Sequence, residues 1–502
     1  MTGRAPDVIV VGAGGSGAVL AARLAERGER VLLLESGPVP APDSTRDGAS
    51  LAAAVPGHPL AFAYSGSLTP GRDHTVVRGR VAGGSTAING GYFRRPRSND
   101  LDDWARAAAD ERWSATATQP IWARVEADRE FGRAPGHGSD GPMPVTRGDT
   151  HHPVNAALLA AGLATGLPLD TDQNASPEAA PGIGPTPTNM RDRERWSTAR
   201  AYLDPAPAGL ELRGRHHVTR VIVSRGQATG VEVLVDDRLE ILNAGRIVLC
   251  AGAIATPQLL VRSGVGPAEL LTASGGLVVH DSPVGAQLHD HPQVVVRFAV
   301  PSSLLDEPFE TALGVSAHGS SGIDGAGSGD LEVLSVLRPL GRMLGTQPDD
   351  SSLSLLVSPL RSTGRGRLLL DTRTQPHLDF RYAETEPDRA RLRAAVRLAA
   401  TLLASDPMRA LDAVPEHPQL TTLDDRSLDS WVLEHLSTAL HSCGTTPMGA
   451  DPATSVVDGR GAVHGIAGLH VADVGILPRT PTGGPAAAAV LIGEVIADAL
   501  TD

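Results

Sequence analysis

The sequence predicts an α/β fold built around a parallel sheet. Residues 8–11 (VIVV) and 31–34 (VLLL) are short, continuous apolar runs, as expected for strands buried on both faces. The stretch between them, from about Ser16 to Arg27, has the composition of a helix. A strand, a helix and a second strand within one short segment form a βαβ unit, in which the two strands run parallel.

A glycine-rich turn joins the first strand to this helix. Gly12, Gly14 and Gly17 fit the pattern G-x-G-x-x-G. The first glycine allows a tight turn, the second lets a pyrophosphate approach the backbone, and the third lets helix and strand pack closely. Glu35 ends the second strand, where a carboxylate can accept a hydrogen bond from a ribose hydroxyl. The segment therefore predicts a dinucleotide site, without distinguishing FAD from NAD.

The rest of the chain alternates between strands, helices and loops. We expect irregular chain or short helix over 38–75, partial helix over 104–131, and loops over 132–148 and 168–187. Residues 301–348, rich in Gly and Ser, are predicted to include mobile loops. Apolar positions at helical spacing predict a helix over 387–404. Strands are predicted within 210–235 and 240–252 and at 353–359, 366–371, 377–380 and 469–473, with further helices at 256–263 and 486–500.

Composition excludes several classes of function. A chain of 502 residues is long for one core, so two or more domains are expected. The net charge of −13 argues against nucleic acid as a partner. The absence of lysine rules out a Schiff-base lysine and a Walker A lysine. No apolar run is long enough for a transmembrane helix, and the first strand begins too early for a signal peptide, so we expect a cytoplasmic protein.

Three distant segments combine with the N-terminal turn. They are RGRVAGGSTAIN at 78–89, CAGAIATPQLLVRSGVGP at 250–267, and HSCGTTPMG at 441–449 with its continuation to Glu494. Together they resemble the glucose–methanol–choline (GMC) family of FAD-dependent alcohol oxidoreductases over nearly the whole chain. The resemblance implies a Rossmann-like FAD-binding domain of the GMC type and an α+β substrate domain with an antiparallel sheet. We expect the FAD-binding domain at 1–140, 190–300 and 436–502, and the substrate domain at 141–189 and 301–435.

The resemblance also assigns cofactor-binding positions. Ile88 occupies the place where some members carry a histidine bonded covalently to the flavin, so we predict non-covalent FAD. The pyrophosphate positions are Gly12, Gly14, Ser16 and Gly17, the ribose position is Glu35, and Val218 matches the strand residue beside adenine. Gly83, Gly84 and Asn89 match the loop beside the flavin, Asp473 matches an acid near its ribityl chain, and Arg80, Ala251, Gly252 and Pro485 complete the predicted site.

Alcohol oxidation removes a proton from oxygen and a hydride from carbon. A flavin accepts the hydride, so the protein must supply a base, and histidine has a suitable pKa. His441 matches the family's catalytic histidine, which opens an H-x-x-G-T segment. The family's second polar residue, His or Asn, corresponds here to Gly484. Either another side chain (Thr482, His435 or Arg479) reaches the site, or a bulky substrate fills the gap, or one base suffices; the volume that glycine leaves favours the bulky substrate.

Two further groups of residues have structural explanations. Cys250 and Cys443 are predicted to be packing residues rather than reactive thiols. His289 and His291 have a spacing that could bind a metal, but the family carries a similar D-H-P segment, so a structural role is expected. We predict no metal site.

Several substrates remain open at this point. NGGYFRR, PVGAQLHDHP and HSCGTTPMG resemble bacterial GMC enzymes associated with the redox cofactor mycofactocin. The substrate would then be a reduced carrier, with oxygen, a quinone or a respiratory carrier as electron acceptor. The alternatives are a choline-type or other small-alcohol dehydrogenase or oxidase, a hydroxynitrile lyase, and an FAD-binding protein without redox turnover.

Overall fold

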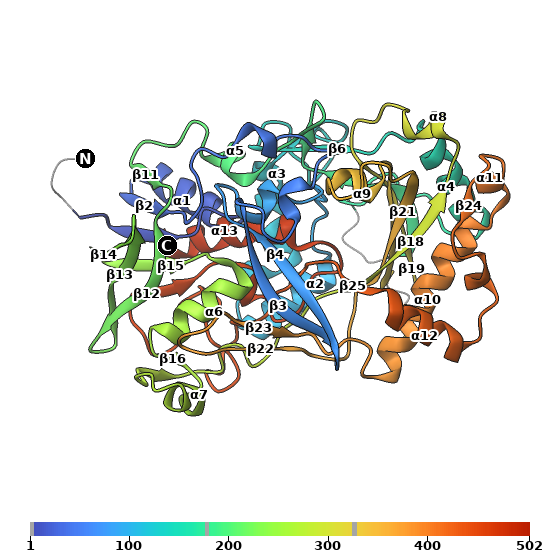
Figure 1. Cartoon of the computed structure of the whole chain (residues 1–502). Helices are drawn as coiled ribbons and strands as arrows, with labels where there is room; N and C mark the ends of the chain where they lie inside the picture. The colour runs from blue at the N-terminus through green and yellow to red at the C-terminus, as the bar shows by residue number, and fades with distance from the viewer. Residues whose placement is uncertain (1–4, 176–179, 324–328, 502) are drawn as a thin grey trace.

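A computed structural model describes residues 5–175, 180–323 and 329–501. A five-stranded parallel sheet lies at one end of the molecule (Figure 1). The strands predicted at 8–11 and 31–34 are confirmed at those residues, and they lie side by side in the sheet. In spatial order the strands are β11 (Leu210–Arg213), β2 (Val31–Leu34), β1 (Val8–Val11), β15 (Arg246–Leu249) and β26 (Leu469–Val471).

Apolar helices cover this sheet and bury its central strands β1 and β2 along their whole length. Helix α1 (Gly17–Glu26) packs against the C-terminal helix α13 (Pro485–Thr501). Their backbones approach closely at Gly493, where a Cβ atom would lie 2.7 Å from the carbonyl oxygen of Ser16. Three antiparallel strands, β12 (His217–Ser224), β13 (Gln227–Val235) and β14 (Arg238–Asn243), pack against β15, and α6 (Gly252–Arg262) follows β15.

A seven-stranded antiparallel sheet forms the other end of the molecule (Figure 1). Helix α10 (Glu386–Leu403) packs on this sheet through Leu392, Val396, Ala399 and Leu403, which confirms the predicted amphipathic helix. The strands follow the order β24 (Val414–Pro415), β18 (Pro292–Ala299), β21 (Ser352–Pro359), β20 (Leu331–Val336), β19 (Leu313–Gly319) and β7 (Gly182–Pro185), and β25 (Leu436–Thr438) also pairs with β18. The predicted boundary at residue 300 assigned β18 to the FAD-binding domain, whereas its hydrogen bonds place it in this sheet.

Two regions predicted without strands contain strands as well as the expected short helices and loops. The segment 38–75 contains β3 (Ala61–Thr69) and the start of β4 (Arg72–Gly79), a hairpin in a sheet with β22 (Arg367–Leu369) and β23 (His377–Asp379). The segment 301–348 contains β19 and β20, which are entirely buried. Small polar residues interrupt the apolar pattern in these segments, and the strands form by pairing with neighbouring strands of their sheets. Part of the predicted loops, 176–179 and 324–328, lies outside the described residues.

Shorter elements complete the chain, and two of them, β6 and β7, interrupt the loops predicted over 132–148 and 168–187. Among the described residues, no helix is both long enough and apolar enough to cross a bilayer. The remaining helices include α2 (Ser98–Ala108), α3 (Ala115–Val125), α4 (Pro153–Ala164), α5 (Thr198–Tyr202), α7 (Ala268–Ala273), α8 (Ser302–Leu305), α9 (Leu340–Met343), α11 (Asp406–Arg409) and α12 (Asp425–His435). The short strands include β5 (Glu126–Asp128), β6 (Met143–Arg147), β8 (Pro187–Thr188), β9 (Met190–Arg191), β10 (Glu194–Arg195), β16 (Val265–Gly266) and β17 (His280–Asp281).

Candidate active site

The predicted pyrophosphate turn requires its glycines. Gly12 has φ of +102°, and a Cβ atom there would lie 2.6 Å from the carbonyl oxygen of Cys250. A Cβ atom on Gly17 would collide with the carbonyl oxygen of Gly12. Ser16 Oγ, at the start of α1, is buried and has no hydrogen-bond partner in the described part of the chain. An orphan donor at a helix N-terminus is what a bound phosphate would satisfy, so the turn fits a dinucleotide.

Glu35 shapes this turn through its carboxylate. One oxygen accepts the backbone N–H of Ala13 at 3.0 Å, and the other accepts that of Gly37 at 2.8 Å. Burial raises the pKa of Glu35, and these hydrogen bonds partly oppose that effect. The structure therefore shows Glu35 holding the loop, while its contact with ribose stays a prediction.

The second glycine-rich segment lies directly on the first. The N–H of Gly83 donates to the carbonyl oxygen of Ala13 at 2.8 Å. A Cβ atom on Gly84 would lie 2.9 Å from Cα of Gly14. Asn89 continues this segment, and its Oδ1 accepts the N–H of Gly91 at 3.0 Å. Residues 12–17 and 83–91 thus form one continuous wall, as the predicted cofactor site requires.

Asp473 links the ends of two sheet strands. Its carboxylate accepts the N–H of Gly252 at 2.9 Å, the hydroxyl of Thr256 at 2.6 Å and the N–H of Gly475 at 2.8 Å. Gly252 has φ of +85°, and a Cβ atom there would meet open space at the start of α6. Asp473 therefore holds the backbone of Gly252 and Gly475 beside the open space at the start of α6. Its direct contact with FAD stays a prediction.

The other predicted cofactor-binding residues lie in β12, on the surface beside Phe62, and at the starts of α6 and α13. Val218 is buried in β12, and the exposed Arg80 lies over the ring of Phe62. Ile88 is buried in a small apolar cluster that includes Val77. Ala251 immediately precedes α6, and Pro485 is the first residue of α13.

His441 forms a direct contact with His291. Their Nδ1 atoms lie 2.9 Å apart, and Nε2 of His291 lies 3.2 Å from the carbonyl oxygen of Leu360. A carbonyl only accepts hydrogen bonds, so Nε2 of neutral His291 carries the proton and its Nδ1 is an acceptor. His441 must then donate from Nδ1, which leaves a lone pair on its Nε2. This assignment gives His441 the tautomer of a general base.

Two chain segments bring these histidines together. His289 and Cys443 exchange two backbone hydrogen bonds of 2.9 Å, which pair the D-H-P segment with the HSCGT segment. Asp290 accepts the N–H of His441 at 3.0 Å and the hydroxyl of Ser442 at 2.7 Å. The expectation that His291 has a purely structural role is therefore incomplete, because this pairing aims its ring at His441.

The histidine pair is neutral at neutral pH. Burial lowers the pKa of His291 to about 4. Desolvation, followed by the neighbouring His291 and Arg78, holds the pKa of His441 well below its usual range. A neutral imidazole at His441 is able to accept a proton.

Gly484 faces His441, and a tyrosine occupies the space beside it. A Cβ atom on Gly484 would lie 3.4 Å from Nε2 of His441 and 2.9 Å from Cδ1 of Tyr92. The hydroxyl of Tyr92 donates to Glu332 at 2.6 Å. The expectation that glycine leaves space for a bulky substrate is wrong at this position, because the Tyr92 ring fills it. Sequence reasoning missed Tyr92, although it stands in the NGGYFRR segment.

Two of the three proposed substitutes for the missing second residue, Thr482 and His435, have partners elsewhere. The hydroxyl of Thr482 donates to Asp100 at 2.7 Å. His435 stacks on Trp431, with ring centroids 4.2 Å apart, and its Nδ1 lies 2.8 Å from the Trp431 carbonyl oxygen. Arg479 is exposed. Cys250 and Cys443 are both buried, and burial raises the pKa of each thiol, as expected for packing residues.

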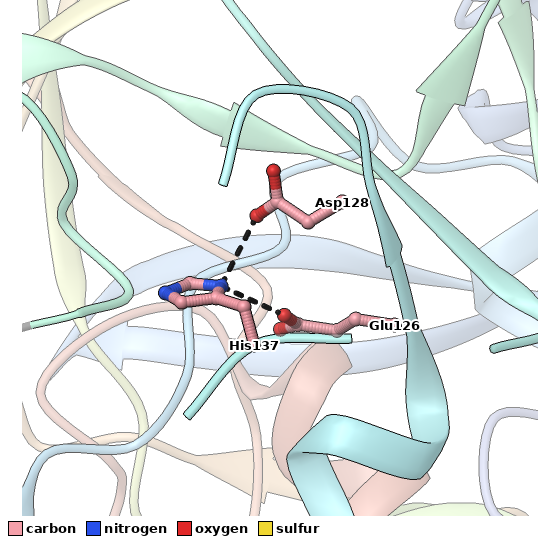
Figure 2. A group of neighbouring side chains, drawn as sticks. All are labelled: Glu126, Asp128 and His137. Atoms are coloured by element: carbon pink, nitrogen blue, oxygen red, sulfur yellow. Dashed lines mark hydrogen bonds and ion pairs between the residues drawn. The ribbon is translucent and has the colours of Figure 1, made fainter. Parts of the chain in front are cut away.

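A separate buried cluster has ligand-like composition (Figure 2). Nδ1 of His137 lies 3.2 Å from Glu126 and 3.3 Å from Asp128, and Nε2 lies 3.1 Å from Asp172. Burial alone lowers the pKa of His137, but hydrogen bonds to these carboxylates raise it to about 10. Arg95 and Arg147 pair with the same carboxylates. The imidazolium therefore holds the place that a metal would take, and the absence of a metal stays a prediction.

The glycine-lined turn and the buried neutral histidine pair fit the class that the comparisons show, an FAD-dependent oxidoreductase. Two family models described as GMC oxidoreductase match residues 6–293 and 361–493. The chain belongs to the GMC oxidoreductase family.

Relatives with known names support this assignment. An uncharacterised GMC-type oxidoreductase in the thcA 5′ region of Rhodococcus erythropolis is 35% identical over 97% of each chain. An oxygen-dependent choline dehydrogenase of Ectopseudomonas mendocina is 32% identical over 99% of this chain and 94% of its own. The crystal structure of pyridoxine 4-oxidase from Mesorbium loti is 28% identical and covers 98% of both chains with a TM-score of 0.87. A formate oxidase structure, 21% identical, covers 100% of this chain and 99% of its own with a TM-score of 0.88 and shows the shared fold.

Proposed function

We propose that this protein oxidises the CH–OH group of an alcohol donor, with His441 as the general base. The observation that carries the proposal is the chain of contacts from the Leu360 carbonyl through His291 to His441. It supports an unprotonated Nε2 on His441, 3.4 Å from a Cβ atom on Gly484, the position that matches the family's second polar residue.

His441 and the start of helix α13 together promote removal of the hydroxyl proton from the substrate. FAD, when bound, supplies the hydride acceptor. Nε2 of His441 accepts the proton, and Nδ1 keeps its own proton and continues to donate to His291. Helix α13 begins at Pro485, so its positive end lies next to Gly484 and favours negative charge on the substrate oxygen. These groups lower the barrier to breaking the O–H bond before or during loss of hydride.

The donor is the open part of this proposal. Choline-type alcohols are suggested by the choline dehydrogenase relatives. Reduced mycofactocin is suggested by the NGGYFRR, PVGAQLHDHP and HSCGTTPMG segments. The volume beside Gly484 adds no support for it, because the Tyr92 ring lies there. The donor is therefore identified by comparing choline, simple alcohols, pyridoxine and reduced mycofactocin as substrates.

The decisive experiment is anaerobic reduction of the bound flavin, followed by its loss of visible absorbance. We expect at least one donor to bleach the flavin, and His441→Ala to slow bleaching by on the order of 10²-fold or more. FAD content checks that the variant remains assembled. Unchanged bleaching in His441→Ala contradicts the assigned base. A flavin that no donor bleaches favours FAD binding without turnover, and cyanohydrin cleavage without bleaching favours a lyase.

The electron acceptor is identified in the second half of the reaction. Hydrogen peroxide released in air indicates an oxidase. Reoxidation by a quinone or an artificial dye, without peroxide, indicates a dehydrogenase that passes electrons to a carrier.

A further inference from the structure

Arg195, in the short strand β10, binds the backbone of the second glycine-rich segment. The residue is 2% exposed. Its Nε donates to the carbonyl oxygen of Asn89 at 2.6 Å, and its Nη1 donates to those of Thr45 at 2.7 Å and Ala87 at 3.3 Å. Nη2 donates to the carbonyl oxygen of Ser50 at 2.6 Å. One guanidinium therefore fastens this segment to the chain that precedes it.

The second glycine-rich segment connects the predicted phosphate turn to the base. Near its start, a Cβ atom on Gly84 would lie 2.9 Å from Cα of Gly14. Just past its end, the ring of Tyr92 lies beside Gly484, which faces His441. A dinucleotide with its pyrophosphate at the turn and its hydride acceptor at the base would follow this segment. The guanidinium binds the segment between these two ends.

Carbonyl dipoles, rather than a carboxylate, accept the hydrogen bonds of Arg195. All four of its acceptors among the described residues are backbone carbonyl oxygens, whereas the buried Arg95 and Arg147 pair with carboxylates. Burial lowers the pKa of Arg195 to about 10, so the guanidinium stays protonated at neutral pH. The charge of Asp47 opposes that shift, but Asp47 is exposed and water screens it. Buried cations are normally paired with an anion, so this one leaves a net positive charge inside the protein.

Hydride transfer adds negative charge to the group that accepts it. A hydride is a proton with two electrons, so a neutral acceptor becomes an anion when it takes one up. A fixed cation in the protein interior attracts that charge more strongly than a cation in water. The cation is also in place before the reaction, so no dipoles have to reorient. A buried positive charge along the cofactor segment therefore favours the reduced form of the cofactor.

Building on the alcohol oxidation proposed above, we propose that Arg195 positions the flavin side of the FAD site and supplies a fixed positive charge that favours uptake of the hydride. It is a positioning residue, because its hydrogen bonds hold the backbone of Ala87 and Asn89. In the reaction the carbinol loses its hydroxyl proton to His441 and its hydride to bound FAD, and becomes a carbonyl group. Arg195 keeps all of its protons throughout.

The test measures the midpoint potential of FAD in the loaded protein. An anaerobic titration with dithionite and a reference dye gives this potential without any alcohol donor. Arg195→Met removes the charge, and we expect the equilibrium ratio of reduced to oxidised FAD to fall by on the order of 10-fold, which lowers a two-electron potential by about 30 mV. Arg195→Lys keeps the charge with fewer N–H donors, so we expect weaker FAD binding and a potential close to that of the wild type.

Two further variants control for general effects of charge and folding. Arg193→Met is the matched control, because Arg193 is exposed and lies in the turn of the same β9–β10 hairpin. Water screens its charge, so its loss should leave the potential unchanged. Should Arg195→Met not hold FAD, Arg195→Gln keeps two N–H donors without the charge and should show the same fall in potential. The Kd of FAD and the melting temperature are measured for every variant.

The outcomes separate a redox role of Arg195 from a purely structural one. Wild-type potentials in the neutral variants overturn the proposal even where FAD affinity or melting temperature falls, because Arg195 then only supports the fold. A fall of equal size in Arg195→Lys or Arg193→Met also overturns it. If no donor bleaches the flavin while the neutral variants lower the potential, the alcohol oxidation is wrong and the role of Arg195 stands. If donors bleach the flavin through His441 and the potentials are equal, the oxidation stands alone.

Discussion

The ring of Tyr92 stands where a side chain on residue 484 would lie, since a Cβ atom on Gly484 would come 2.9 Å from Cδ1 of Tyr92. In place of the family's second polar residue this chain has Gly484, with the ring of Tyr92 beside it. The hydroxyl of Tyr92 donates a hydrogen bond to Glu332. We expect Gly484→Asn to reduce flavin reduction by about 10-fold or more, because the new side chain meets Tyr92. The double variant Gly484→Asn with Tyr92→Ala should recover part of the rate. Equal rates in the single and double variants would contradict the steric pairing.

His291 sets the tautomer of His441, so its loss should weaken the base without removing FAD. His291→Phe fills similar volume but cannot accept from Nδ1 of His441. We expect flavin reduction to slow by about 10-fold or more, as for other histidine bases that lose their orienting partner. The pH profile provides the second readout, because the base loses a neighbour that helps to lower its pKa. A His291→Phe variant with the wild-type rate and pH profile would argue against this role of His291.

The buried histidines should make the protein sensitive to acid. Burial lowers the pKa values of His289 and His291 to about 4, below the value of about 6.5 in an unfolded chain. The unfolded chain therefore binds more protons, and stability is complete above about pH 6.5 and falls as pH decreases towards about 4. Urea unfolding across this range measures the effect, which reaches about 3 kcal/mol for each histidine. A His291→Phe variant should show a shallower loss, and an identical slope would contradict its contribution.

His137 should show the opposite pH dependence. Its pKa is raised to about 10, so its contribution to stability is complete below about pH 6.5 and is lost as pH rises through about 10. His137→Gln removes the imidazolium but leaves Arg95 and Arg147 paired with the same carboxylates, so we expect a loss of about 2 kcal/mol in unfolding free energy, as for charged hydrogen bonds. Treatment with EDTA should leave the melting temperature unchanged. A lower melting temperature that a divalent cation restores would indicate a metal among these residues.

The buried Ile88 predicts that FAD dissociates on denaturation. Isoleucine has no nucleophile that could bond to the flavin, and its side chain packs with Val77 and Val81. Acid precipitation should therefore release the flavin into the supernatant, where its absorbance is measured. Flavin that stays with the precipitated chain would show a covalent attachment elsewhere.

The glycine turn of the predicted cofactor site was readable from the sequence because it depends on local backbone geometry. The glycine turn, the first two strands and Glu35 lie within one βαβ unit, whose residue spacing carries the pattern directly. Strands β19 and β20 were missed for the opposite reason. Their glycines, serines and histidine weaken the apolar pattern, and neighbouring strands bury them in the completed sheet.

The sequence by itself determined the family, the FAD cofactor and His441 as the candidate base. Tertiary structure decided which side chains surround that base. His291 and His441 are 150 positions apart, and Tyr92 comes from the opposite end of the chain. A motif records residue spacing along one segment, whereas the occupant of a space depends on which distant segments pack together. For this reason the sequence predicted empty space beside Gly484, whereas in the folded chain the Tyr92 ring lies there.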